Sequence, residues 1–514
     1  MRITLICADD DNWAVGLRSI SSVLKGAGHR TRIILTSSLR GRPAALAADS
    51  LREACRGSGL IGISSMSRGS SRAKSLIEAL RPLGAPIVWG GMHPTLFPED
   101  CAGHADLVCR GEGESFMVDL AGRLANGRGY LDIPNGGYLR EGRLVLNDLA
   151  PLVPDLDALP FVDFTFEDEY SADAEGAVRP NADMTTATSV LFSGSRGCAF
   201  ACHYCSNARL KSLYDGKGRY NRKMSVPKFV ASAKRCREIF PRAKYIYFTD
   251  EDFFARPLAE FREFAETYPE EVGLPFECMA SPQQISEEKM ALLVRAGLWR
   301  VDVGVESGSD RIKKEVFNRL GTNDVVLRAA AAVNRFPRVV AYYFFIIGNP
   351  YEDREDLLGT VGLIRRLPPP AFVRTYNLVF LPGTHLYERA MRDGIIRGLA
   401  DSGFDLDFLA GFDHRKHAWK AKNLYLNALI SLMTGKSTRR RIGFVPRFAL
   451  PLLTRRRWLD LNDRHHGLSK IMIALARAGL VWRRRAMLLV SRFLKDPSSA
   501  YRAGDLVKKA VPKT

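Results

Sequence analysis

The chain has 514 residues, of which 46% are hydrophobic and 25% charged, and this ordinary usage excludes a mostly disordered chain and leaves room for two to four domains. No run of about 18 uncharged apolar residues is present, and residues 1–20 lack the features of a signal peptide, so we expect a cytoplasmic protein. The net charge is +19, and residues 401–514, with 24 basic and 8 acidic residues, hold most of it.

Residues 1–130 alternate short apolar runs with helical patterns. The strand-like runs are RITLICAD, TRIILTS, LIGISSMS and APIVWGG, and ADLVCRGEGE closes the series. This alternation predicts an α/β fold with a doubly wound, Rossmann-like parallel sheet. Such sheets bind ligands beyond the carboxyl ends of their strands.

Three further regions follow. Residues 131–188 are rich in proline and acidic residues and are predicted to be a linker. Residues 189–390 repeat the strand–helix alternation six times, which predicts a partial (β/α)6 barrel with its chemistry on the loops after the strands. For residues 391–514 we predict a basic, mostly helical C-terminal region.

Three cysteines lie close together after the first predicted barrel strand, at Cys198, Cys202 and Cys205. Thiolates are the ligands of iron–sulfur clusters, and three of them can hold three irons of a cubane and leave the fourth iron open. The alternatives are buried free thiols or a structural zinc site. Zinc needs a fourth protein ligand, and His203 is poorly placed because it adjoins Cys202. We therefore favour an iron–sulfur cluster.

The spacing C-x3-C-x-aromatic-C, with Tyr204 at the aromatic position, resembles the radical S-adenosylmethionine (SAM) enzymes over about residues 189–390. The resemblance implies a [4Fe-4S] cluster on the three cysteines, whose open iron chelates the amino and carboxylate groups of SAM. Reduction, by an electron donor of the flavodoxin or ferredoxin type, then cleaves SAM to a 5′-deoxyadenosyl radical. That radical takes a hydrogen atom from a small-molecule substrate.

The same resemblance implies SAM contacts at the ends of later strands. Asp250, Glu251 and Asp252 would lie near the amino group, although a solvated turn is an equal alternative. The remaining expected contacts are Tyr204, Glu306, Ser307 and Gly348. Around Glu306 a helix N-terminal cap is the alternative. The family's usual acid three residues after Gly348 is replaced by Tyr351, with Glu352 one residue further on.

The N-terminal region resembles the cobalamin-binding class of radical SAM enzymes. Residues 11–16 stand where methionine-synthase-type proteins carry D-x-H-x-x-G, but Trp13 replaces the histidine, so we expect no histidine on the lower face of cobalt. The expected cobalamin contacts are Asn12, Trp13, Gly16, Ser64, Ser65, Gly90, Gly91 and His93. The alternatives are a flavodoxin-like domain without a cofactor and a methylthiotransferase domain, whose local sequences do not match.

The C-terminal region carries three arginine triplets, at 439–441, 455–457 and 483–485, and an apolar stripe along 468–493. A basic amphipathic helix of this kind predicts peripheral contact with the inner membrane surface through residues 430–514. The alternative is a helix packed on the barrel with a solvated basic face. Nucleic-acid binding is not expected, because few aromatic side chains interleave with the charge.

Taken together, the resemblance implies methylation of an unactivated carbon. One SAM supplies a methyl group through cobalamin and a second supplies the radical. The basic region suggests a hydrophobic or lipid-like substrate. The alternatives are a non-methylating relative that forms rings or couples carbons, and an iron–sulfur sensor or scaffold that binds SAM without turnover.

Overall fold

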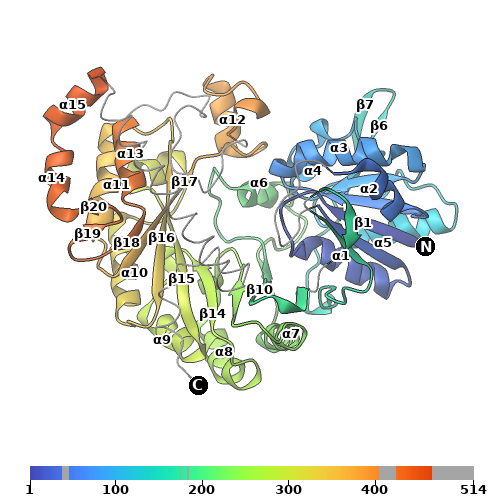
Figure 1. Cartoon of the computed structure of the whole chain (residues 1–514), viewed down its shortest axis with the longest axis horizontal. Coiled ribbons are helices and arrows are strands. Elements are labelled where there is room, and N and C mark those ends of the chain that lie inside the picture. Colours follow the sequence, from blue (N-terminus) through green and yellow to red (C-terminus); the bar gives the residue numbers. More distant parts are fainter. Residues whose placement is uncertain (37–45, 174, 182–183, 404–423, 466–514) are drawn as a thin grey trace. The chain divides into compact units, whose positions relative to one another are not determined.

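The computed structural model describes residues 1–36, 46–173, 175–181, 184–403 and 424–465 (Figure 1). Its chain divides into two compact units. Unit 1 comprises Met1–Thr186, Arg209–Met224 and Ile239–Pro241, and unit 2 comprises Ala187–Ala208, Ser225–Glu238 and the described residues from Arg242 onward. The predicted apolar stripe at 468–493 and the third arginine triplet lie outside the described residues.

Unit 1 is built on a nine-stranded sheet in the order β7-β6-β5-β4-β3-β1-β2-β8-β9. Its six central strands are parallel: β1 (Arg2–Cys7), β2 (Arg30–Leu35), β3 (Leu60–Ser64), β4 (Ile87–Gly90), β5 (Leu107–Cys109) and β8 (Glu169–Ala172). The edges are antiparallel: β6 (Gly136–Arg140), β7 (Arg143–Leu146) and β9 (Val178–Pro180). The helices of this unit are α1 (Val15–Gly26), α2 (Ala48–Cys55), α3 (Ser70–Leu80), α4 (Met92–Leu96) and α5 (Glu114–Ala125).

Both faces of this sheet are buried, which is why its strands read as continuous apolar runs. Ile6 and Trp89 belong to the core on one face, whereas Leu5 and Val88 belong to the core on the other. Each such fully buried side chain stabilises the fold by about 1.5–3 kcal/mol. Part of the predicted linker, residues 131–188, adds strands to this same sheet.

Unit 2 is built on a second nine-stranded sheet. Its six parallel strands, in spatial order, are β10 (Ser189–Phe192), β13 (Tyr245–Phe248), β14 (Phe276–Ala280), β15 (Leu298–Glu306), β16 (Val340–Ile347) and β17 (Ala371–Asn377). Three short antiparallel strands extend it: β18 (Gly435–Ser437), β19 (Arg441–Ile442) and β20 (Val445–Pro446). The six parallel strands confirm the predicted α/β class for this part of the chain.

Helices alternate with these strands. They are α7 (Val226–Ile239), α8 (Leu258–Glu271), α9 (Glu287–Ala296), α10 (Asn323–Asn334), α11 (Arg354–Arg366) and α12 (His385–Arg392), followed by α13 (Leu424–Leu432), α14 (Leu450–Leu453) and α15 (Arg456–His465). Helix α6 (Ser206–Leu213) follows the cysteines, and two short strands are β11 (Ser195–Arg196) and β12 (Arg222–Lys223). Within the described residues, no helix has both the length and the apolarity needed to cross a bilayer.

Candidate active site

In unit 1, the carboxyl ends of β1, β3 and β4 are adjacent, because β3 pairs with both neighbours. The Ala8 amide donates to the Ser64 carbonyl at 2.9 Å, and the Ser65 amide donates to the Gly90 carbonyl at 3.1 Å. The His93 amide donates to the Ser65 carbonyl, also at 3.1 Å. Five of the expected cobalamin contacts are therefore brought together at one sheet edge, where open α/β sheets bind their ligands.

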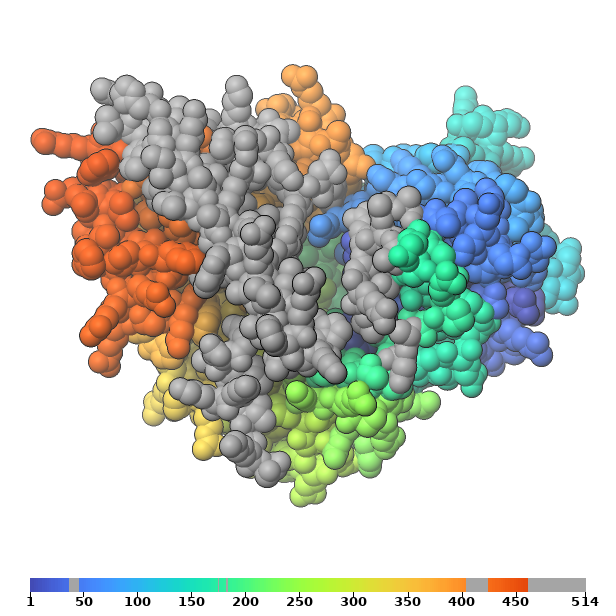
Figure 2. Space-filling model, in the orientation of Figure 1, coloured from blue at the N-terminus to red at the C-terminus, as the bar shows by residue number. Residues whose placement is uncertain are grey.

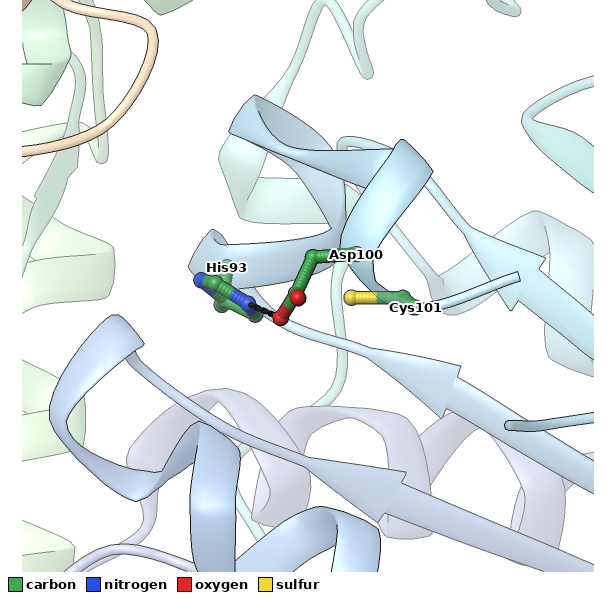
Figure 3. Close-up of side chains that lie close together, drawn as sticks. All are labelled: His93, Asp100 and Cys101. Atoms are coloured by element: carbon green, nitrogen blue, oxygen red, sulfur yellow. Dashed lines mark hydrogen bonds and ion pairs between the residues drawn. The ribbon is translucent and has the colours of Figure 1, made fainter. Parts of the chain in front are cut away.

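His93 is fully buried, and Figure 3 shows its ring beside the Asp100 carboxylate. Both of its ring nitrogens have partners. Its Nδ1 lies 3.1 Å from the Ser67 hydroxyl, and its Nε2 lies 3.0 Å from Asp100 Oδ2. Lys74 donates to the other Asp100 oxygen at 2.7 Å. The side chain thus braces the loop after β4. The Ser65 side chain also has a structural partner, because its hydroxyl accepts a hydrogen bond from the Trp89 indole N–H at 2.9 Å.

His93, Asp100 and Cys101 are a trio of metal-type ligands within 4.8 Å of one another. Their chemistry does not favour a cation. The Lys74 ammonium already occupies the Asp100 carboxylate. Burial raises the pKa of the Cys101 thiol above its ordinary range, so this sulfur stays protonated. We interpret the trio as a structural brace.

Gly91 precedes α4 with φ of 99° and ψ of −167°, a region that essentially only glycine adopts. A Cβ there would lie 2.7 Å from the Ser65 carbonyl oxygen. We expect Gly91→Ala to lower the free energy of unfolding by about 3 kcal/mol or more. Gly84→Ala is the matched control, because Gly84 has φ of 68° but open space at Cβ, and should cost only about 1 kcal/mol. Thermal unfolding measures both, and equal losses would contradict the crowding argument.

The β1–α1 loop carries Trp13. Asp11 accepts the Trp13 amide at 2.9 Å, and the ring packs on Phe164 and Phe240 at centroid distances of 6.1 and 5.4 Å. This side chain is partly exposed and offers no metal ligand. Gly16 is exposed, and a Cβ built there meets nothing within 4 Å. This loop is therefore open to solvent at Gly16 and partly open at Trp13.

In unit 2, the cysteine loop is held by backbone contacts with two distant segments. The His203 amide donates to the Phe317 carbonyl at 2.9 Å, and the His203 carbonyl accepts from the Leu386 amide at 3.0 Å. Asn318 donates from its side chain to the Ala201 carbonyl at 2.9 Å. These bonds fix the loop on the segment after β15 and at the start of α12.

The three cysteines are unpaired in disulfides, and Cys202 is buried while the other two are partly exposed. Burial raises the pKa of Cys198 to about 12 and that of Cys205 to about 11, so iron must displace protons on binding. Three thiolates on one loop fit a four-iron cluster with one open iron better than structural zinc, which takes four protein ligands.

Arg319 is a buried cation beside this loop. Its Nη1 lies 3.5 Å from Cys202 Sγ and 3.2 Å from the Tyr204 hydroxyl. Its Nη2 donates to the Gly304 carbonyl and lies 3.8 Å from Glu306 Oε1. One guanidinium thus connects a cysteine sulfur, the aromatic position of the motif and the carboxylate at the end of β15.

Acidic side chains line the strand ends as expected. Asp250 Oδ2 accepts the Gly194 amide at 3.2 Å. Burial raises the pKa of Asp252 to about 6, and Glu251 beside it is exposed. Glu306 has φ of 71°, a strained conformation for a non-glycine residue, at a register shift in β15. Strain of this kind is concentrated at binding sites, which is consistent with the expected role of Glu306.

Several buried polar atoms at these strand ends lack a hydrogen-bond partner in the described part of the chain. They are Asp252 Oδ2, both amide atoms of Gln283, Asn349 Nδ2 and Glu352 Oε2. They follow β13, β14 and β16, which are near neighbours in the sheet. Buried polar groups are normally paired, so this set fits a polar ligand such as SAM.

Sequence reasoning named neither Arg319 nor Gln283 as a site residue. Arg319 lies 13 positions after Glu306 in a segment without a motif, and only the fold brings it back to the cysteines. Glu352 was noted only as displaced from the usual position. In the structure it is buried, and the Ser307 hydroxyl donates to it at 3.3 Å.

Burial, and then repulsion from Asp356, raises the pKa of Glu352 to about 8. Between about pH 5 and pH 8 the Glu352 carboxyl is therefore protonated in the folded state but ionised in the unfolded state. The free energy of unfolding falls as the pH rises through this range. We expect Glu352→Gln to flatten this loss and to raise the free energy of unfolding at pH 8 by about 2 kcal/mol. Urea unfolding at pH 5 and pH 8 measures it. The exposed Glu263→Gln is the control, and equal pH slopes for both variants would contradict the account.

Comparison with known families matches both units. A model of the B12 binding domain matches residues 1–121, and a model of the Radical SAM superfamily matches residues 192–364. The chain belongs to the cobalamin-dependent radical SAM enzyme family. The resemblance inferred from the cysteine spacing and the N-terminal sheet is confirmed, as are the cofactors [4Fe-4S], SAM and cobalamin. Which residues contact SAM and cobalamin stays a prediction.

Curated relatives of the chain are methyltransferases. An uncharacterised methyltransferase of Pyrococcus horikoshii is 27% identical over 316 residues, which cover 60% of this chain and 64% of that protein. Cytidylyl-2-hydroxyethylphosphonate methyltransferase of Streptomyces wedmorensis is 23% identical over 57% of this chain and 58% of its own length. The matches thus span less than two thirds of these relatives.

Two solved structures share the fold. TsrM, a radical SAM methyltransferase from Kitasatospora setae solved with tryptophan and a SAM analogue, has a TM-score of 0.62 at 17% identity, over 77% of each chain. OxsB, a cobalamin-dependent SAM radical enzyme solved with aqua-cobalamin and SAM, has a TM-score of 0.63 at 16% identity, over 97% of this chain and 76% of its own. At these identities the likeness concerns the fold alone.

Proposed function

We propose that this protein methylates an unactivated carbon of a hydrophobic, lipid-like small molecule. The observation that carries a methyl-transfer reaction is the pairing of a cobalamin-type sheet with a three-cysteine radical SAM sheet in one chain. Methyltransferase activity among the relatives supports it. When bound, the cluster and SAM supply a carbon radical, and cobalamin supplies a transferable methyl group.

Each proposed residue has a physical task in this reaction. Cys198, Cys202 and Cys205 hold the cluster, and the backbone bonds of the loop keep their sulfurs in place. Glu306 and the unpartnered polar atoms after β13, β14 and β16 orient SAM. Tyr204 and Phe317, packed edge to face at 4.9 Å, cover the loop with apolar surface and exclude water.

The N-terminal residues have a different task. Gly16 and the loop around Trp13 would lie against the cobalamin ring, and the Trp13 side chain cannot ligate cobalt. The predicted contacts from Ser64, Gly90 and Gly91 lie at the adjoining strand ends. We place the reaction in the cytoplasm, with a flavodoxin- or ferredoxin-type protein as electron donor and with the basic C-terminal region near the inner membrane surface.

Product analysis with methyl-labelled SAM tests this function. The cluster- and cobalamin-loaded protein is incubated anaerobically with a reductant and a bacterial lipid extract, and Cys198→Ala protein serves as the control. We expect labelled lipid together with 5′-deoxyadenosine. Deoxyadenosine without labelled product would support the non-methylating alternative, and neither product would support a sensor or scaffold.

A further inference from the structure

Four large apolar side chains are exposed within fifteen residues of unit 2. The exposed fraction is 86% for Phe448, 50% for Phe444, 48% for Leu452 and 39% for Trp458. Ten large hydrophobic side chains are exposed in the whole described part of the chain, so these four are a local concentration. Exposed apolar groups gathered in this way mark an interaction surface.

The same segment of the sequence is rich in basic residues. Residues 436–459 contain eight lysines and arginines and no acidic residue. Seven of the eight are exposed: Lys436, Arg439, Arg440, Arg441, Arg455, Arg456 and Arg457. The next acidic residue, Asp460, pairs with Arg354 at 2.6 Å. The surface formed by residues 436–458 is therefore both apolar and strongly cationic.

The backbone of the 436–458 surface is anchored to the rest of unit 2. Strand β18 pairs with β17, and Arg447, the one basic residue that is not exposed, donates to the Arg365 carbonyl at 2.6 Å and to the Ser437 hydroxyl at 2.9 Å. The Tyr425 hydroxyl donates to the Leu453 carbonyl at 3.0 Å. The segment is orange to red in Figure 2 and lies at the surface. Phe448 and Leu452 are thus exposed on an anchored backbone.

The positive charge of the 436–458 surface indicates which kind of partner binds to it. Residues 466–514 of the same chain hold eleven basic and two acidic residues, so they would add like charge rather than neutralise it. A second copy of the surface is repelled for the same reason. An anionic bilayer offers phosphate groups to the arginines and an apolar boundary to phenylalanine and leucine, which is the pattern of interfacial membrane binding.

We propose that the 436–458 surface docks onto an anionic membrane, with Phe448 and Leu452 in the acyl boundary and the exposed arginines on lipid phosphates. This proposal deepens the proposed function, because it places a lipid-modifying enzyme beside its substrate. Docking itself needs no turnover.

Vesicle flotation of the full, cluster-loaded chain tests the proposal. The vesicles contain phosphatidylcholine alone or with phosphatidylglycerol, and the salt concentration is varied. We expect binding only with phosphatidylglycerol, and a loss of at least about tenfold in Phe448→Ser/Leu452→Ser protein. Arg439→Gln/Arg440→Gln/Arg441→Gln should weaken binding by a similar factor and reduce its salt dependence. Leu131→Ser/Leu139→Ser, at positions 47% and 44% exposed in unit 1, is the matched control and should bind normally.

Other outcomes would overturn the proposal. These are equal binding to both vesicle types, equal losses in the Leu131/Leu139 control, binding of RNA in place of vesicles, or a dimer that the Phe448/Leu452 variant disrupts. Circular dichroism and cluster absorbance establish that each variant is folded. Vesicle binding without methyl transfer would support the membrane-docking surface and contradict only the proposed function. Methyl transfer without vesicle binding would support the proposed function and contradict the docking surface.

Discussion

Alanine at Cys198, Cys202 or Cys205 is expected to remove the iron–sulfur absorbance near roughly 400 nm from anaerobically reconstituted protein. We predict that each sulfur holds one iron of the cluster. The other six cysteines are buried in the structure. SAM cleavage to 5′-deoxyadenosine should fall below detection in the same variants, and iron and sulfide analysis should show an incomplete cluster.

Cys236→Ala is the control for this result. Cys236 is fully buried in α7, and burial raises the pKa of its thiol to about 12, so it acts as a packing residue. The variant should keep the absorbance and lose only about 1 kcal/mol of stability. If absorbance survived in all three loop variants, the assignment of the cluster to this loop would be wrong.

The second large effect is expected at Arg319. A buried guanidinium 3.5 Å from Cys202 Sγ stabilises negative charge on that sulfur, and the charge increases when the cluster gains an electron. Arg319→Gln should therefore lower the reduction potential by about 50 mV, the equivalent of ~1 kcal/mol. SAM cleavage should slow as well, because Glu306 loses its cationic neighbour.

A redox titration followed by electron paramagnetic resonance measures this potential. Arg311→Gln is the matched control, because Arg311 lies in the same unit but pairs with Asp356. Arg319→Lys keeps the charge, so its potential should lie between those of the wild type and the glutamine variant, and it can be titrated if the glutamine variant fails to load iron. An unchanged potential at full iron content would contradict this role.

The features that could be predicted from the sequence are those with a local signal. The spacing of Cys198, Cys202 and Cys205 is readable without a fold, because all three ligands lie on one short loop. The parallel strands are readable because burial on both faces makes runs such as Arg2–Cys7 apolar. The carboxylates after β13 and β15 were expected as SAM contacts only because the cysteine motif resembles that of the radical SAM enzymes.

Features that depend on distant pairing could not be predicted. Strand β8 is short and polar, and it lies beside β2 partly because Glu169 pairs with the buried Arg18 at 2.7 Å, a contact across 151 positions of sequence. Arg319 reaches Cys202 only through the fold. Strands β18–β20 have two or three residues each, too few to show a period. The side chains of His93 and Ser65 are held inside by partners in other segments, which are Ser67 and Asp100 for His93 and Trp89 for Ser65.

Mössbauer spectroscopy of isotopically enriched protein, with and without SAM, tests the central claim most directly. That claim is a four-iron cluster held by three cysteines, with one iron open to SAM. We predict that SAM changes the spectrum of one iron in four and leaves the other three unaltered. Four irons that are all unaffected by SAM, or zinc in place of iron at the cysteine loop, would contradict the account.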